Sequence, residues 1–125
     1  MALTGLLGIL TEDPAAASWA EAAGAGEAGE REIVAPPGAF PLLAGLAAHP
    51  DFGNRPVLLV AATVRQAEDL VASLRRLLSP DDVVLFPAWE TLPHERMSPS
   101  PDVVGQRLSV LRRLARPDVA RRGTD

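Results

Sequence analysis

The sequence contains no cysteine and no lysine. Without cysteine the chain has no disulfide, no thiolate metal ligand and no cysteine nucleophile. Without lysine it lacks the phosphate-binding lysine of a P-loop and any Schiff-base lysine. Its two histidines, His49 and His94, are far apart in the sequence and cannot by themselves complete a zinc site. We therefore predict no metal site and no catalytic residue.

Long hydrophobic runs are also absent. No apolar stretch reaches the length of about eighteen residues that a membrane-spanning helix needs. The first ten residues lack the basic start of a secretory signal. The 125 residues, of which 47% are hydrophobic, suffice for one small domain or part of one. We expect a cytoplasmic protein without a membrane partner.

Positive charge is concentrated near the C-terminal end. Up to Asp102 the chain has six arginines against fourteen acidic residues, whereas from Val103 onward it has six arginines against two acidic residues. Such a basic segment can contact DNA or an acidic partner. The candidate contact residues are Arg107, Arg112 and Arg113. The alternative interpretation is that these arginines line a solvated helix face.

The hydrophobic pattern predicts helices that alternate with short strands. Helices are expected at 3–10, 14–23, 41–48, 63–78 and 102–116, and strands at 32–35, 57–62 and 83–86. Thr63 and Gln66 predict a capping box, and Asp102 is the expected N-cap of the last helix. That helix should turn Val104, Leu108, Leu111, Leu114 and Ala115 towards a core. The expected fold class is α/β, with a short, mostly parallel sheet flanked by helices.

A turn formed by Pro36, Pro37, Gly38 and Ala39 lies between a predicted strand and a predicted helix. NTPases hold phosphate at this place on free backbone N–H groups. The two prolines remove two of these donors, and neither a lysine nor a Ser/Thr for magnesium is present at the turn. We interpret the turn as a degenerate phosphate loop that binds no cofactor.

A proline-rich loop follows the third predicted strand. It carries Trp89, Glu90, Thr91, Leu92, His94, Glu95 and Arg96. Partners usually dock at the carboxyl ends of strands in open α/β sheets, so these residues are predicted to form an interface. One alternative is that Trp89 and Leu92 fold back over the core. Another is a hydrolase in which Glu90, His94 and Glu95 act as acid and base.

Several segments, in this order, resemble the N-terminal part of bacterial transcription-repair coupling factors. They are residues 32–38, 55–60, 65–70 and, above all, the string PAWETLPHERMSP at 87–99. The resemblance continues through Asp102, Gly105, Arg107, Leu108, Val110, Leu111, Arg113 and Leu114, and it covers roughly residues 1–117.

The resemblance implies a partial RecA-like, three-layer domain similar to the first domain of the excinuclease protein UvrB. This domain would span residues 31–117, after N-terminal helices and an acidic linker at 1–30 and before a disordered tail at 118–125. The full family protein is implied to be an ATP-dependent DNA translocase that displaces stalled RNA polymerase and recruits excision repair through the excinuclease protein UvrA. Its motor would lie outside this chain.

Two classes of function follow from the sequence. In the first, the chain is a non-catalytic scaffold segment that contacts the remaining domains of a coupling factor and, through the whole protein, the excinuclease protein UvrA, RNA polymerase and DNA. In the second, it is a free-standing small α/β binding protein or hydrolase that uses the loop from Trp89 to Arg96.

Overall fold

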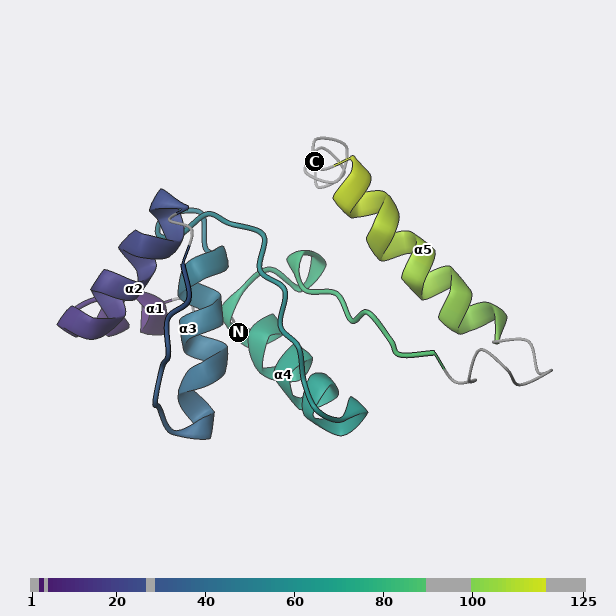
Figure 1. Cartoon of the computed structure of the whole chain (residues 1–125), viewed down its shortest axis with the longest axis horizontal. Helices are drawn as coiled ribbons and strands as arrows, with labels where there is room; N and C mark the ends of the chain where they lie inside the picture. The colour runs from purple at the N-terminus through teal and green to yellow at the C-terminus, as the bar shows by residue number, and fades with distance from the viewer. Residues whose placement is uncertain (1–2, 4, 27–28, 90–99, 117–125) are drawn as a thin grey trace. The chain divides into compact units, whose positions relative to one another are not determined.

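A computed structural model describes residues 3, 5–26, 29–89 and 100–116 (Figure 1). Their elements are α1 (Gly5–Leu10), α2 (Pro14–Ala25), η1 (Pro37–Ala39), α3 (Phe40–Ala48), α4 (Val64–Leu77), η2 (Pro80–Asp82) and α5 (Pro101–Ala115), where η marks a 3-10 helix. The contacts divide the chain into two compact units, Met1–Val83 and Val84–Asp125. The predicted tail at 118–125 lies outside the described residues.

Local sequence signals set the ends of the helices in the first unit. The side chain of Asp13 accepts the N–H groups of Ala15 and Ala16, and it thereby caps α2. At the start of α4 the hydroxyl of Thr63 accepts the N–H of Gln66 at 3.2 Å. This is the Thr63 half of the predicted capping box. The predicted helices of this unit are confirmed to within a few residues.

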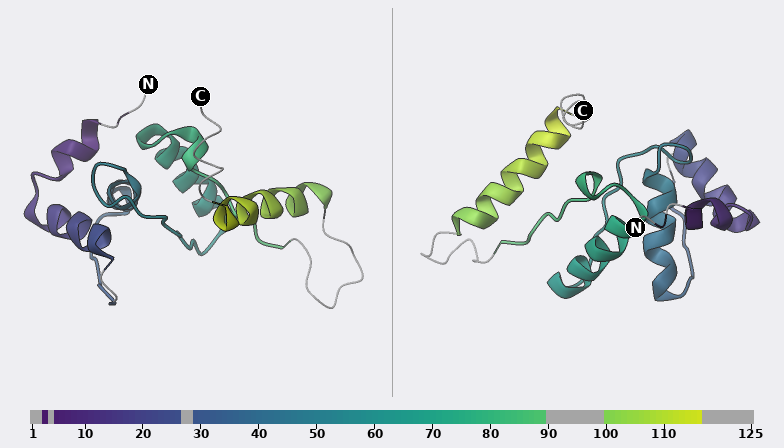
Figure 2. Two further views of the ribbon diagram at one scale, coloured as in Figure 1. Left: turned by 90° about the horizontal axis from the view of Figure 1, so that it is seen from above. Right: turned by 180° about the vertical axis from the view of Figure 1, so that it is seen from behind.

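Helix α3 lies at the centre of the first unit. It contacts α1, α2 and α4, and Figures 1 and 2 show it between α2 and α4. The core cluster contains Leu7, Ala16, Ala20, Leu46 and Leu77, contributed by all four helices. Leu7 and Leu46 are fully buried. Burial of these leucines removes apolar surface from water and holds the four helices together.

A tight loop after α3 joins this helix to α2. The N–H of Gly53 donates to the carbonyl of Leu46, and the N–H of Arg55 donates to the carbonyl of Ala47, each at 3.0 Å. The Arg55 guanidinium donates to the carbonyl of Gly24 at 2.9 Å. Gly24 lies in the last turn of α2, where carbonyls lack an intrahelical donor. Arg55 therefore caps α2 and ties it to the loop.

The predicted parallel sheet and RecA-like layering are wrong, because residues 3, 5–26, 29–89 and 100–116 contain no strand. The segments 32–35, 57–62 and 83–86 have no ladder and form irregular chain. A central strand would be buried on both faces, yet Leu58 and Val60 are 83% and 88% exposed. Short apolar runs do not reveal by themselves whether a partner strand exists. Here the helices supply the core instead.

The turn at Pro36 to Ala39 therefore lacks the preceding strand of a phosphate loop. Pro37–Ala39 forms η1, which leads directly into α3. The N–H of Ala39 donates to the carbonyl of Pro36 at 2.8 Å, and the N–H of Phe40 donates to that of Pro37. These two donors are used inside the turn itself.

Helix α5 departs from expectation at its start and on its apolar face. Ser100 is its N-cap instead of Asp102, and the Ser100 hydroxyl accepts the N–H of Val103. No residue of α5 is buried. Leu108, Leu111 and Leu114, which were expected to face a core, are exposed.

Candidate interaction site

Helix α5 holds one arginine against the segment that precedes the proline-rich loop. The guanidinium carbon of Arg107 lies 4.0 Å from the ring centroid of Phe86 and 4.3 Å from that of Trp89. The same guanidinium donates a hydrogen bond to the carbonyl of Pro87. We call Phe86, Pro87, Trp89 and Arg107 the arginine clamp. A cation over an aromatic ring at an exposed site contributes about 0.5–1 kcal/mol.

The local sequence explains how the clamp forms. Phe86 and Trp89 are three residues apart, and Pro87 between them has a fixed φ angle. On the other side, Ser100 and Pro101 fix the start of α5 and thereby the position of Arg107 along the helix. Arg107 is half-buried, whereas the Trp89 side chain remains 52% exposed. The clamp thus holds one side of the indole with a cation and leaves part of the ring exposed.

The structure describes some of the predicted site residues and leaves others outside the described part of the chain. Trp89 is described, and it lies against Arg107, which the sequence had assigned to a different candidate surface. Arg112 and Arg113 lie on the same helix as Arg107. The predicted interface residues Glu90, Thr91, Leu92, His94, Glu95 and Arg96 lie outside the described residues. The residues Pro36, Pro37, Gly38 and Ala39 belong to the first compact unit.

Sequence reasoning missed Phe86 and Pro87 as members of the site. Phe86 had been assigned to a buried strand, although its side chain is exposed. The aromatic rings themselves were the available signal, since an arginine is attracted to the face of such a ring. The sequence alone does not indicate which of the arginines on α5 meets them, because that depends on the path of the chain between the two segments.

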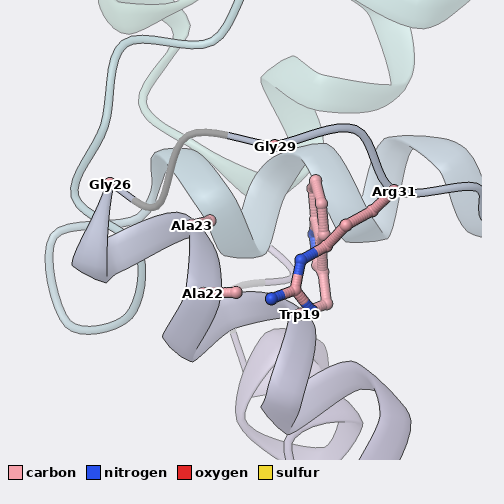
Figure 3. Close-up of a pocket in the computed structure, with 6 residues that line it drawn as sticks. All are labelled: Trp19, Ala22, Ala23, Gly26, Gly29 and Arg31. Carbon is pink, nitrogen blue, oxygen red and sulfur yellow. The ribbon is translucent and has the colours of Figure 1, made fainter.

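A pocket of about 310 Å³ lies beside α2 in the first unit (Figure 3). It is lined by Trp19, Ala22, Ala23, Gly26, Gly29 and Arg31. The indole N–H of Trp19 donates to the carbonyl of Leu43 at 3.1 Å, which fixes the ring against α3. An indole, small residues and a guanidinium provide neither a nucleophile nor a general base. Sequence reasoning missed this pocket.

Within the described residues, no group of three or more His, Cys, Asp and Glu side chains could hold a metal ion. None of the helices in this part of the chain is long and apolar enough to cross a membrane.

The clamp gives a prediction for Trp89. In a Trp19→Phe background Trp89 is the only tryptophan, because the chain has two. Arg107→Gln should shift its fluorescence emission to longer wavelength, since the ring loses the guanidinium that covers one side. The free energy of unfolding should fall by only about 1 kcal/mol, as the site is exposed. Arg112→Gln is the matched control and should leave the emission unchanged; equal spectra for both variants would contradict the clamp.

Comparison with known proteins identifies similar sequences. The chain is 49% identical over 98 residues to proteins named transcription-repair-coupling factor from Mycobacterium bovis (strain ATCC BAA-935 / AF2122/97) and Mycobacterium tuberculosis (strain CDC 1551 / Oshkosh). A protein of the same name from Haemophilus influenzae (strain ATCC 51907 / DSM 11121 / KW20 / Rd) is 53% identical over 34 residues, or 27% of this chain and 3% of that protein. These matches confirm the resemblance seen in the sequence.

The matched region is a small part of each relative. It covers 78% of this chain but only 8% of the length of either mycobacterial protein. No family model matches the chain, and no solved structure matches it.

Proposed function

We infer that this chain is a segment of a transcription-repair-coupling factor. The single observation that supports the inference most strongly is the 49% identity over 98 residues. Identity at this level over most of the chain is far beyond what a shared composition would produce. We further propose that the segment lies at the N-terminal end of the full protein, because the sequence at 87–99 resembles the N-terminal part of coupling factors.

We propose that the segment itself is not an enzyme and serves as a scaffold for contacts with the other domains. The arginine clamp supports this role, because a half-exposed indole held by a cation is suited to an interface and supplies no catalytic group. Aromatic residues and arginines are also the residue types that carry most binding energy at interfaces. The interface would continue into the sequence from Glu90 to Arg96.

The activity of the whole protein belongs to the same proposal. It would be an ATP-dependent DNA translocase of the cytoplasm that displaces stalled RNA polymerase and recruits excision repair through the excinuclease protein UvrA. The alternative of a free-standing binding protein or hydrolase is less well supported, because the 49% identity is to parts of much longer coupling factors.

A segment exchange tests the proposal. The matched segment of the Mycobacterium tuberculosis factor is replaced by that of this chain, and the hybrid is expressed in a mycobacterial strain without its own coupling factor. We expect faster repair of the transcribed strand than of the non-transcribed strand. An unrelated helical segment of equal length is the control and should not restore this preference. A hybrid that accumulates normally but gives no strand preference would contradict the proposed function.

The isolated chain is also expected to bind no ATP. No lysine is present to meet the phosphates, Pro36 and Pro37 offer no N–H, and the N–H groups of Ala39 and Phe40 are used inside the turn. Calorimetric titration with ATP and magnesium should therefore give no binding heat. A protein with a lysine-bearing phosphate loop, titrated under the same conditions, is the positive control. Micromolar affinity would show that another nucleotide site exists.

A further inference from the structure

Residues 57–62 form an apolar segment that the core of the first unit leaves uncovered. The segment leads from the loop after α3 into α4 without helical turns (Figure 1). The exposed fractions of Val57, Leu58, Leu59 and Val60 are 41%, 83%, 42% and 88%. This alternation has the two-residue period of extended chain, in which successive side chains point to opposite sides. Leu58 and Val60 therefore share one side, which faces solvent. We call residues 57–62 the edge segment.

The backbone of the edge segment is also unpaired. Within the described part of the chain, residues 57–62 form no backbone hydrogen bond. A row of free N–H and C=O groups on extended chain is a template on which another extended segment can pair. The edge segment contains neither proline nor glycine, so each of its residues can donate to a ladder and bring a side chain to it.

Charge does not oppose the pairing of the edge segment with an identical one. No charged residue occurs between Arg55 and Arg65, and the guanidinium of Arg55 is bound to the carbonyl of Gly24. Proteins commonly keep exposed edges apart by placing charged residues, especially lysine, on them, and this chain has no lysine. Short apolar segments of low charge and without proline assemble with copies of themselves. The edge segment has this composition.

We propose that the edge segment pairs in antiparallel orientation with the edge segment of a second copy of this chain. Such a pair of identical segments is self-complementary about a two-fold axis. With Leu59 of each copy at the centre, Leu58 of one copy lies opposite Val60 of the other, so the most exposed side chains pack together. Two short strands alone are marginally stable in water. The second edge of each segment accepts a further copy, and the pairing therefore extends as the concentration rises.

Other occupants fit the edge segment less well than a second copy does. Nucleic acid requires positive charge, and a charged protein segment would find no opposite charge between positions 56 and 64. The described residues offer no strand of the same chain for pairing, so the pairing is between chains and restores no sheet within one chain. It does not depend on the proposed role in transcription-coupled repair, because it follows from the exposure and composition of the edge segment.

Sedimentation and infrared spectroscopy of the whole chain at increasing concentration test the proposal. We expect monomers at low concentration and dimers or larger species at high concentration. The associated species should show an amide I band of intermolecular β-structure that the dilute chain lacks. In the dilute monomer the edge segment stays exposed, so variants of Leu58 should keep their stability there.

Variants of exposed residues locate the contact. Val60→Pro should abolish the association and the β-structure band, because it removes a backbone donor from the edge. Leu58→Lys should abolish them as well, since a lysine on an edge opposes pairing. Leu114→Lys, which changes an exposed leucine of the other unit, is the matched control and should leave both unchanged. Circular dichroism of the dilute variants shows whether their helices are retained.

Cross-linking tests the register of the pair. The chain has no cysteine, so a single introduced cysteine reports only on its own position. Residues opposite each other in an antiparallel pair have Cα atoms about 4.5–5.5 Å apart, which a disulfide can span. On oxidation Leu59→Cys should therefore form disulfide-linked dimers, whereas Leu114→Cys should remain mostly monomeric.

Three results would overturn the proposal. The first is a chain that stays monomeric throughout, or a monomer that binds an unrelated strand-forming peptide at the edge segment, since a strand of a different protein would then be the occupant. The second is association without a β-structure band, or association that Leu114→Lys removes, because apolar helix surfaces would then form the contact. The third is equal cross-linking of Leu59→Cys and Leu114→Cys, which would exclude the proposed register.

Discussion

Leu46→Ala is expected to lower the free energy of unfolding by about 3 kcal/mol. Leu46 is fully buried in the cluster that joins all four helices of the first unit. Truncation of a buried leucine loses its transfer free energy and leaves a cavity, and such changes cost about 2–5 kcal/mol. Chemical denaturation followed by far-ultraviolet circular dichroism measures the loss, because the affected elements are helices.

Leu58→Ala is the matched control for Leu46→Ala. Leu58 is of the same residue type and the same unit, but it lies in the irregular segment and its side chain is mostly exposed. Its truncation should change the free energy of unfolding by less than about 0.5 kcal/mol. An equal loss for both leucines would mean that the 57–62 segment is buried, and it would refute the helical core described above.

Gly53→Ala is expected to destabilise the first unit by about 3 kcal/mol. A Cβ atom at Gly53 would lie 2.3 Å from the carbonyl oxygen of Ala47 and 2.7 Å from its Cα atom. These are backbone atoms at the end of α3, so they cannot move aside like a flexible side chain. The loop would have to shift, and it would break the Gly53 to Leu46 hydrogen bond; forced overpacking of this kind costs about 1–3 kcal/mol or more.

Gly8→Ala provides the comparison for Gly53→Ala. A Cβ atom at Gly8 would meet nothing within 4 Å, and alanine favours a helix more than glycine does. Thermal unfolding should therefore show an unchanged or slightly raised midpoint for Gly8→Ala and a clearly lowered one for Gly53→Ala. Similar midpoints for the two variants would contradict the close approach of Gly53 to α3.

The helices could be predicted from the sequence because their signals are local. The hydroxyl of Thr63 and the carboxylate of Asp13 each bond to N–H groups two or three residues away, so sequence neighbours alone decide the helix start. The absence of strands from the described residues could not be predicted in the same way. Whether Val57 to Val60 joins a sheet depends on a neighbouring strand, and the apolar run itself does not show whether such a strand exists.

Only the part of the candidate site that has a local signal in the sequence could be predicted. Trp89 is conspicuous in the sequence because a large aromatic residue stands in a proline-rich, polar loop. Its contact with Arg107 was not predictable, since 18 positions separate the two residues and no local pattern links them. The exposure of Leu111 was also missed, because helical periodicity identifies an apolar face without showing whether anything covers it.

The central claim is that this chain acts as a non-catalytic contact segment through its arginine clamp. The most direct test introduces Arg107→Gln into the hybrid coupling factor and measures repair of the transcribed strand relative to the non-transcribed strand. We expect the strand preference to fall to that of a strain without the factor, while ATP hydrolysis by the purified hybrid is unchanged. Arg65→Gln, an exposed arginine of α4, should keep both properties. Full strand preference with Arg107→Gln, or a parallel loss of ATP hydrolysis, would contradict this claim.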